Sequence, residues 1–279
     1  MFRICRYLLI YAVLLLTACS VMQDRTKLAK SLAQRGDLQK QKINTSEFTL
    51  ITFYKWANLN SNLLVIYIEG DGYAWKRKQY LSSDPTPRDP LALKLAAQDP
   101  NPAVLYIARP CQYLSAKDLK ACAVKYWSSH RYAEEVVASI NEVIDWGVSQ
   151  SGADSIALYG YSGGGSIAVL VAARRDDVAR LTTVAANLDH VKWTEIHGIT
   201  PLSGSLNAAD YATKIEHISQ LHLIGAKDKL VPASITETYK AKANNPEKIK
   251  IKIISDFDHR CCWAEFWPTL LSQIKAPEN

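Results

Sequence analysis

Short apolar segments alternate with helix-patterned segments along most of this 279-residue chain. The first apolar segment alternates in polarity and the later ones are apolar throughout, which is typical of strands buried on both faces of a sheet. Strands are predicted at residues 48–56, 62–70, 103–109, 154–161, 181–187, 220–228 and 250–257. Helices are predicted at residues 89–98, 128–150, 166–175 and 263–274, with further helices between the later strands. The alternation predicts one α/β domain with a mostly parallel central sheet and helices on both faces.

The segment GYSGG, residues 160–164, joins a predicted strand to a predicted helix and fits the pattern G-x-S-x-G. A tight turn at this point strains the serine backbone and leaves no room for neighbouring side chains, hence the glycines. It would project the Ser162 hydroxyl beyond the carboxyl edge of the sheet, where ligands of parallel sheets bind. A phosphate-binding loop is the alternative, but the spacing G-x-G-x-x-G and a following lysine are missing. We therefore interpret Ser162 as a nucleophile.

A nucleophilic serine needs a base and an acid that orients the base. The chain has six histidines, and His259 is the one placed shortly after the last predicted strand, in SDFDHRCCW. Asp228 lies just beyond an earlier strand, in GAKDKLVP. An N-cap role is the alternative for Asp228, and Asp256 or Asp258 could serve as the acid instead.

The chain order Ser162, Asp228, His259, each after a successive strand, resembles the α/β-hydrolase family over residues 48–275. The resemblance implies a serine hydrolase that cleaves carboxylic esters, or related acyl bonds, through an acyl-enzyme intermediate. An amidase or an acyltransferase of the same fold is a further possibility, as is a membrane-tethered binding or scaffold protein without turnover.

The resemblance also implies an oxyanion hole formed by the Gly163 N–H and an N–H from the loop after an early strand. This chain has EGDGYAW there, residues 69–75, which keeps the glycines of the family pattern and adds two acidic residues. The Asp71 N–H is the predicted second donor, with Gly72 as its neighbour. Since a carboxylate near a developing oxyanion would raise the barrier, we expect Glu69 and Asp71 to point away or be paired, with Arg109 a candidate partner.

Substrate size is indicated by residues 191–211, where the family often has a lid. At about twenty residues this segment is short for a large lid, which favours an accessible pocket and modest substrates. Tyr73, Trp75, Trp127 and Trp193 are candidates for its lining, with core packing the alternative for each.

The first twenty residues combine a basic start, an apolar stretch and a small-residue end, which is the layout of a secretory signal. The ending LTAC resembles the lipobox of bacterial lipoproteins, which implies a signal peptide at residues 1–18 and acylation of Cys19. An ordinary signal peptide is the alternative. Because Ser20 is not aspartate, the resemblance favours the outer membrane, facing the periplasm. Residues 19–45 are then predicted as a polar tether of weakly helical character and residues 46–279 as the hydrolase domain.

Four of the six cysteines lie beyond the signal and lipobox, an even number suited to an oxidising compartment. Cys111 with Cys122 closes a short loop and is the preferred disulfide among three possible pairings. Cys261 and Cys262 would then be free thiols or a vicinal disulfide. A zinc site fits less well, because paired CxxC spacing is missing.

The formal charge of +6 comes from scattered lysines and arginines, with no run of five. This favours a solvated surface and argues against a nucleic-acid partner. The expected partners are a small acyl substrate and the membrane, through Cys19. The sequence contains no sign of a metal, nucleotide or organic cofactor.

Overall fold

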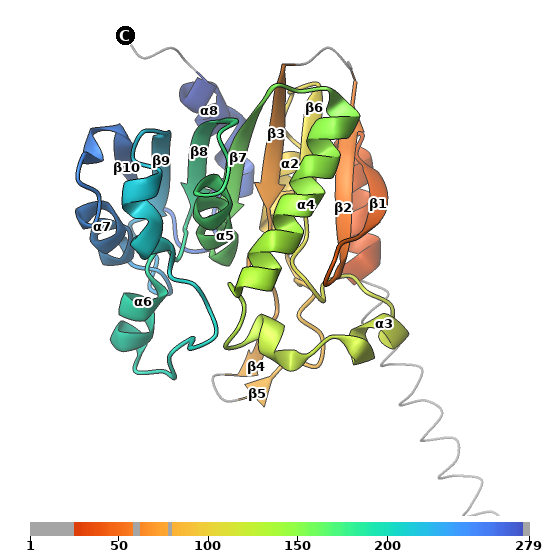
Figure 1. Cartoon of the computed structure of the whole chain (residues 1–279), viewed down its shortest axis with the longest axis horizontal. Helices are drawn as coiled ribbons and strands as arrows, with labels where there is room; N and C mark the ends of the chain where they lie inside the picture. Colours follow the sequence, from red (N-terminus) through yellow and green to blue (C-terminus); the bar gives the residue numbers. More distant parts are fainter. Residues whose placement is uncertain (1–24, 58–61, 78–79, 276–279) are drawn as a thin grey trace, which may run out of the picture.

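A computed structural model of the chain describes residues 25–57, 62–77 and 80–275. Its centre is an eight-stranded sheet in the order β1-β2-β6-β3-β7-β8-β9-β10 (Figure 1). The strands are β1 (Gln39–Asn44), β2 (Thr49–Trp56), β3 (Leu63–Ile68), β6 (Ala103–Ile107), β7 (Ser155–Tyr161), β8 (Val178–Val184), β9 (Ser219–Gly225) and β10 (Ile249–Ile254). In this order, each neighbouring pair from β6 to β10 is parallel. At the other edge, β2 pairs antiparallel with both β1 and β6. A small hairpin, β4 (Trp75–Arg77) and β5 (Tyr80–Leu81), lies outside the main sheet.

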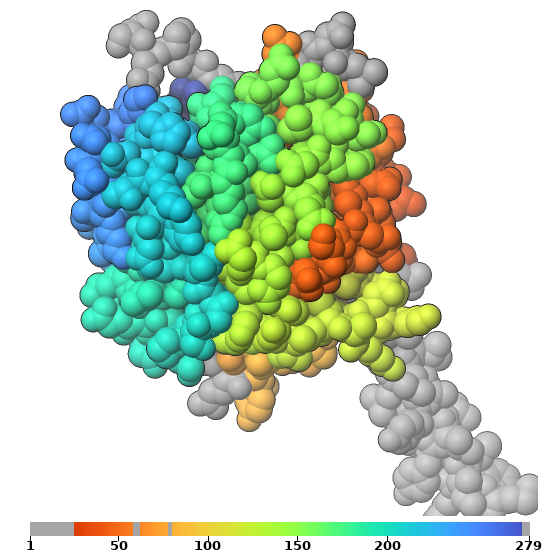
Figure 2. Space-filling view, in the orientation of Figure 1, coloured from red at the N-terminus to blue at the C-terminus, as the bar shows by residue number. Residues whose placement is uncertain are grey.

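Helices cover both faces of the sheet. On one face lie α4 (Glu134–Ser151), α5 (Gly163–Ala172), α7 (Ala233–Ala241) and the 3₁₀ helix η2 (Ala208–Lys214). The other face carries α2 (Leu91–Ala96), α8 (Trp263–Lys275) and a helix at residues 25–35. The remaining helices are α3 (Ala116–Ala121), α6 (His190–His197) and the 3₁₀ turns η1 (Val124–Trp127) and η3 (Pro246–Lys248). In Figure 2 the layer that contains α4 and α5 faces the viewer and covers the sheet. The predicted fold class is therefore confirmed.

The central strand β3 shows why the strands read as continuously apolar. Leu64, Ile66 and Ile68 belong to the core under α4 and α5. Val65 and Tyr67 point the other way, into the core under α2 and α8. All five side chains are at most 1% exposed. Because successive strand residues face opposite sides and both sides are covered, both sets must be apolar.

Two segments differ from their prediction. The helix predicted from residue 128 begins only at Glu134, because residues 128–133 form a loop. The Arg131 Nε donates to the Ser128 carbonyl at 2.8 Å, and the Tyr132 N–H donates to Ser205 Oγ at 3.1 Å. These side-chain contacts satisfy the loop where helical hydrogen bonds would otherwise be needed.

The prediction that residues 19–45 form a tether is wrong for residues 25–45, the part that the structure describes. Residues 25–35 are helical, and Ala29, Leu32 and Ala33 on that helix are at most 5% exposed. Their spacing makes one apolar stripe that packs on the sheet. Residues 39–44 form β1, which pairs with β2 over its whole length. The domain therefore includes residues well before 46. The proposed signal peptide and Cys19 lie outside the described residues, and none of the helices described could span a bilayer.

The cysteines of the described chain form two disulfides. Cys111 is bonded to Cys122, as predicted, and their Cα atoms are 5.8 Å apart. Cys261 is bonded to the adjacent Cys262, the second of the two states left open for this pair. Over the described residues, no cluster of three or more His, Cys, Asp or Glu side chains could hold a metal ion.

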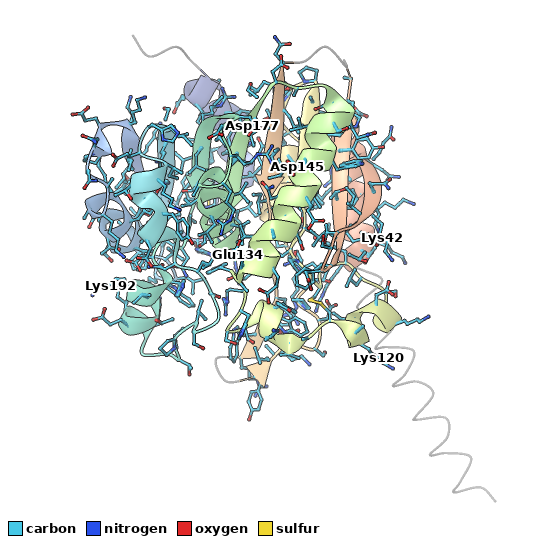
Figure 3. The ribbon with its side chains drawn as sticks, viewed as in Figure 1. Lys42, Lys120, Glu134, Asp145, Asp177 and Lys192 are labelled. Atoms are coloured by element: carbon cyan, nitrogen blue, oxygen red, sulfur yellow. A yellow bond between two sulfur atoms is a disulfide. The ribbon has the colours of Figure 1, made fainter. Side chains whose placement is uncertain are left out.

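Charges of both signs share the surface of the helical layer (Figure 3). Glu134 on α4 pairs with Arg174 at 2.7 Å, and Lys192 on α6 pairs with Glu195 at 3.0 Å. Arg175 pairs with Asp177 at 2.6 Å. The exposed Lys192–Glu195 pair contributes about 0–1 kcal/mol, so it mainly keeps the surface hydrated.

Candidate active site

Ser162 occupies the turn between β7 and α5. Its backbone has φ 50° and ψ −122°, a region that residues with a side chain rarely adopt. The Ser162 N–H donates to the Val184 carbonyl at 2.9 Å, and its carbonyl accepts from the Gly165 N–H at 3.0 Å. Such a conformation costs about 1–3 kcal/mol and persists where surrounding contacts enforce it. The predicted strand–serine–helix turn is therefore present.

The glycines around Ser162 are required by close approaches. A Cβ on Gly160 would lie 2.5 Å from the Gly164 carbonyl oxygen, and one on Gly164 would lie 2.3 Å from that of Ile68. A Cβ on Gly163 would lie 2.2 Å from an oxygen of the Asp71 carboxylate. The turn thus fits against the end of β3 only without these side chains.

His259 and Asp228 meet Ser162 at this edge of the sheet. His259 Nε2 lies 3.1 Å from Ser162 Oγ, and His259 Nδ1 lies 2.8 Å from Asp228 Oδ2. The other Asp228 oxygen accepts from the N–H groups of Leu230 and Val231, both at 2.8 Å. The Asp228 side chain is fully buried and that of His259 is 12% exposed. The carboxylate is therefore fixed by the backbone with one oxygen directed at the imidazole.

The two alternative acids have other contacts. Asp256 is 86% exposed and pairs with Lys227 at 2.9 Å. Asp258 Oδ1 accepts from the N–H groups of Arg260 and Cys261, both at 2.7 Å. Asp228 is thus the carboxylate that contacts His259.

The loop after β3 runs beside Ser162. A Cβ on Gly70 would lie 3.3 Å from the Ser162 Cβ, so the start of this loop borders the serine directly. Within the described chain, the backbone N–H groups of Asp71 and Gly163 donate to no protein acceptor. Gly72 has φ 67°, and a Cβ there would lie 2.1 Å from the Pro85 carbonyl oxygen, so this glycine forms the turn that follows.

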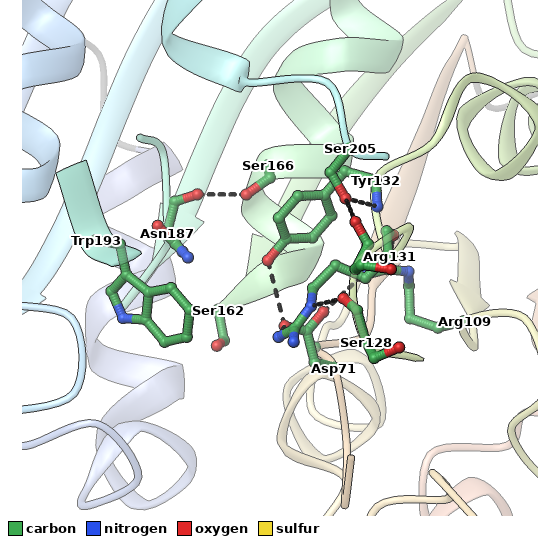
Figure 4. Close-up of polar contacts among 12 residues, drawn as sticks. Asp71, Arg109, Ser128, Arg131, Tyr132, Ser162, Ser166, Asn187, Trp193 and Ser205 are labelled. Atoms are coloured by element: carbon green, nitrogen blue, oxygen red, sulfur yellow. Dashed lines mark hydrogen bonds and ion pairs between the residues drawn. The ribbon is translucent and has the colours of Figure 1, made fainter. Parts of the chain in front are cut away.

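The Asp71 carboxylate is paired, as expected, but with more partners than predicted. It contacts Arg109 at 3.2 Å, Arg131 at 2.7 Å and the Tyr132 hydroxyl at 3.2 Å. Figure 4 shows this group on one side of Ser162 and Trp193 on the other. Burial opposes the ionisation of Asp71, but Arg131 and Arg109 outweigh it and hold its pKa below the ordinary value. Arg131 and Tyr132 could not be predicted here, because their segment reads as the start of a helix.

Glu69 is the second acidic residue of this loop, and it is 1% exposed. It accepts hydrogen bonds from the Gly70 N–H at 3.0 Å, the Tyr106 hydroxyl at 3.1 Å and the Ala92 N–H at 3.4 Å. Burial raises the pKa of Glu69 to about 7, with these hydrogen bonds opposing the shift. At neutral pH this carboxyl is therefore only partly charged.

Ser162 and His259 open into a cleft of about 370 Å³. Of the aromatic candidates, Tyr73 and Trp75 line this cleft. Trp127 is buried instead, and its indole N–H donates to the Ser82 carbonyl at 3.0 Å. From the segment expected to form a lid, Trp193 lines the cleft and donates to the Leu230 carbonyl at 2.7 Å. A separate open groove of about 1000 Å³ lies between α6 and η2 and contains neither Ser162 nor His259.

Comparison with known proteins identifies the fold of this chain. No family model and no curated protein matches the chain. Among solved structures, an esterase of Pyrococcus furiosus is similar, with 12% identity, coverage of 85% of this chain and 88% of that chain, and a TM-score of 0.59. Est1E from Butyrivibrio proteoclasticus matches with 14% identity, coverage of 85% of this chain and 99% of that chain, and a TM-score of 0.54. An acylaminoacyl peptidase of Pyrococcus horikoshii matches with 11% identity, coverage of 87% and 42%, and a TM-score of 0.59. The chain has the α/β-hydrolase fold.

Proposed function

We propose that this protein is a serine hydrolase that cleaves carboxylic esters through an acyl-enzyme intermediate. One observation carries the proposal: Ser162, His259 and Asp228 form a continuous chain of hydrogen bonds at 3.1 Å and 2.8 Å. A hydroxyl, an imidazole and a buried carboxylate in this order are the arrangement that activates a serine. Solved structures of similar fold include an esterase and a protein described as a lipase, which supports the same activity.

The proposed reaction begins when Ser162 Oγ attacks the ester carbonyl and His259 Nε2 takes the hydroxyl proton. As the tetrahedral intermediate collapses, the bond to the alcohol oxygen breaks and His259 returns the proton to the leaving alcohol. Water then repeats the sequence on the acyl-enzyme and releases the acid. Asp228 accepts from Nδ1–H throughout, which holds the imidazole tautomer that leaves Nε2 free for Ser162.

The Gly163 and Asp71 N–H groups are the proposed oxyanion donors. Both lack a protein acceptor in the described chain, and the loop bearing Asp71 borders Ser162. The positive N-terminal end of α5 adds to their effect. The Asp71 carboxylate is near enough to oppose a negative oxygen, but its charge is balanced by Arg109 and Arg131.

Replacement of the serine tests the activity. We expect the native protein to hydrolyse p-nitrophenyl acetate or butyrate, and Ser162→Ala to lose at least about a thousandfold in kcat, as removal of a triad nucleophile does. Ser166→Ala is the matched control, because Ser166 donates to the Asn187 carbonyl on the buried side of α5. Unchanged hydrolysis by folded Ser162→Ala would refute the proposal.

We also propose that Cys19 is acylated and anchors the domain at the outer membrane, facing the periplasm. The support is the sequence pattern alone, a short apolar segment followed by LTAC. Metabolic labelling with radioactive palmitate should mark the native chain in the membrane fraction. Cys19→Ala should be unlabelled and released from that fraction, and labelling that persists in this variant would contradict the anchor.

A further inference from the structure

Three arginines line the cleft that holds Ser162: Arg88, Arg131 and Arg260. They come from three separate segments, the loop before α2, the loop before α4 and the loop after β10. The acidic residues of the same cleft are Glu69, Asp71 and Asp89. Whether the cleft is electropositive therefore depends on how these acidic groups are engaged.

The charge of each acidic group is either balanced by a cationic partner or, for Glu69, reduced by burial. Asp71 contacts both Arg109 and Arg131, so one carboxylate meets two guanidinium groups and one positive charge remains. Asp89 forms an ion pair with Lys94. Glu69 is enclosed among hydrogen-bond donors with its pKa raised to about 7 by burial. The acidic side chains of the cleft thus leave its arginines largely uncompensated.

The buried member of the set is Arg131, whose side chain is 7% exposed. Its Nη1 contacts Asp71 at 2.7 Å and its Nε donates to the Ser128 carbonyl at 2.8 Å. The surroundings hold the guanidinium rigidly, so little side-chain entropy is lost when an anion binds. The Asp71 carboxylate contacts the Arg131 guanidinium and also lies beside Gly163, whose N–H is a proposed oxyanion donor.

The two other arginines lie at the exposed rim. The Arg88 guanidinium carbon stands 3.7 Å from the centre of the Tyr73 ring, a stacked arrangement that fixes the plane of the guanidinium. Arg260 directly follows His259. In the described part of the chain, neither side chain pairs with a carboxylate. Planar guanidinium groups of this kind match the geometry of carboxylate and phosphate groups.

We propose that the ester cleaved at Ser162 carries an anionic group, a carboxylate or phosphate, which Arg88, Arg131 and Arg260 bind while the ester carbonyl lies at the serine. This inference rests on the proposed function and narrows its substrate class. It predicts a preference for half-esters of diacids, or for esters of phosphorylated alcohols, over neutral esters of equal length. The arginines are binding residues here, and the proton transfers remain those of His259.

Two esters of equal length test the preference: p-nitrophenyl hydrogen adipate, which is anionic, and p-nitrophenyl methyl adipate, which is neutral. The ratio of their kcat/KM values, after subtraction of spontaneous hydrolysis, should exceed one and fall as salt rises. Arg88→Gln and Arg260→Gln should each lower this ratio several-fold towards one, mainly through KM, because each variant removes a charged hydrogen-bond donor to the anion. Arg35→Gln, on the exposed face of the helix at residues 25–35, is the matched control and should leave the ratio unchanged.

Inhibition by free adipate and by inorganic phosphate distinguishes the two anion types, because the preferred group should compete at the lower concentration. Equal kcat/KM for the two esters, with no response to Arg88→Gln or Arg260→Gln, would overturn the anion preference alone. If neither ester is hydrolysed and Ser162 is not labelled by a fluorophosphonate, the proposed function fails as well.

Discussion

Single residues around Ser162 explain why this turn accepts no other side chains. The Gly163 position is limited by the Asp71 carboxylate, at 2.2 Å from an ideal Cβ. That carboxylate cannot move away easily, because Arg109, Arg131 and Tyr132 all hold it. The glycine, the acidic residue and the two arginines therefore act as one packed unit beside the proposed oxyanion site.

Gly163→Ala tests whether this packed unit positions the proposed oxyanion donors. The added methyl group must displace either the Asp71 carboxylate or the α5 N-terminus, so we expect kcat to fall about a hundredfold or more, the scale of losing one oxyanion donor. Steady-state kinetics on p-nitrophenyl butyrate measures the loss. Full activity in this variant would show that the added methyl group is accommodated without moving the N–H at residue 163, and would contradict the packed unit.

Glu69 gives a prediction about stability against pH. Its ordinary pKa is 4.5 and its folded value is about 7. Between these values the folded state holds a proton that the unfolded state releases, so stability falls as pH rises through this range. Relative to Glu69→Gln, which does not titrate, the native protein should lose about 2–3 kcal/mol of unfolding free energy between pH 5 and 8. Urea unfolding at several pH values measures this, and a constant difference between the two proteins would contradict it.

At the scale of elements, the loops show where sequence patterns end. The predicted strands and α5 lie within three residues of their predicted ranges, with β8 and α5 both beginning three residues early. The central strands β3, β6 and β7 are buried on both faces, so their apolar pattern leaves one solution. The segment at residues 128–133 has no such constraint from periodicity. Its conformation depends on contacts with Asp71 and Ser205, which are distant in sequence. Arg131 and Tyr132 therefore enter the site by tertiary contacts that the local pattern does not encode.

The Cys111–Cys122 disulfide closes the loop that contains α3. Replacing both cysteines with alanine should lower the unfolding free energy by about 2–3 kcal/mol, the loop-entropy contribution for a loop of this length. Denaturant unfolding of the double variant under non-reducing conditions measures the change. A variant as stable as the native protein would mean that this loop is already ordered in the unfolded chain.

At the scale of the whole molecule, the fold class and the proposed Ser162 and His259 pair follow from the sequence, but the choice among three candidate acids and the extent of the domain do not. The alternation of strands and helices predicts the parallel sheet, and the order of Ser162, Asp228 and His259 predicts their meeting at one edge. The packing of the helix at residues 25–35 and the strand β1 are missed, because polar residues dominate the composition of this segment. Only packing shows that Ala29, Leu32 and Ala33 form a buried stripe.

The position of Arg25 links that helix to the cleft. Its Nη1 donates to the Thr86 carbonyl at 3.1 Å, and its guanidinium carbon lies 5.1 Å from the centre of the Tyr73 ring, which lines the cleft. With Cys19 acylated as proposed, five residues separate it from Arg25, so the anchor lies at most about 20 Å of extended chain from this point. The cleft would then stay close to the membrane surface.

A comparison of anchored and released protein tests this arrangement. The acylated chain in vesicles should hydrolyse a vesicle-embedded p-nitrophenyl ester at least about tenfold faster than Cys19→Ala, because tethering raises the effective concentration. Both forms should hydrolyse soluble p-nitrophenyl acetate at the same rate. Equal rates on the embedded ester would show that anchoring does not direct the cleft to the membrane.

The most direct test of the central claim is the site and rate of fluorophosphonate labelling, read by tandem mass spectrometry. The proposed triad predicts a single adduct on Ser162, with labelling at least about a thousandfold slower in His259→Ala and markedly slower in Asp228→Asn. An adduct on another residue, or a labelling rate that does not change in folded His259→Ala, would contradict the claim that these three residues act together.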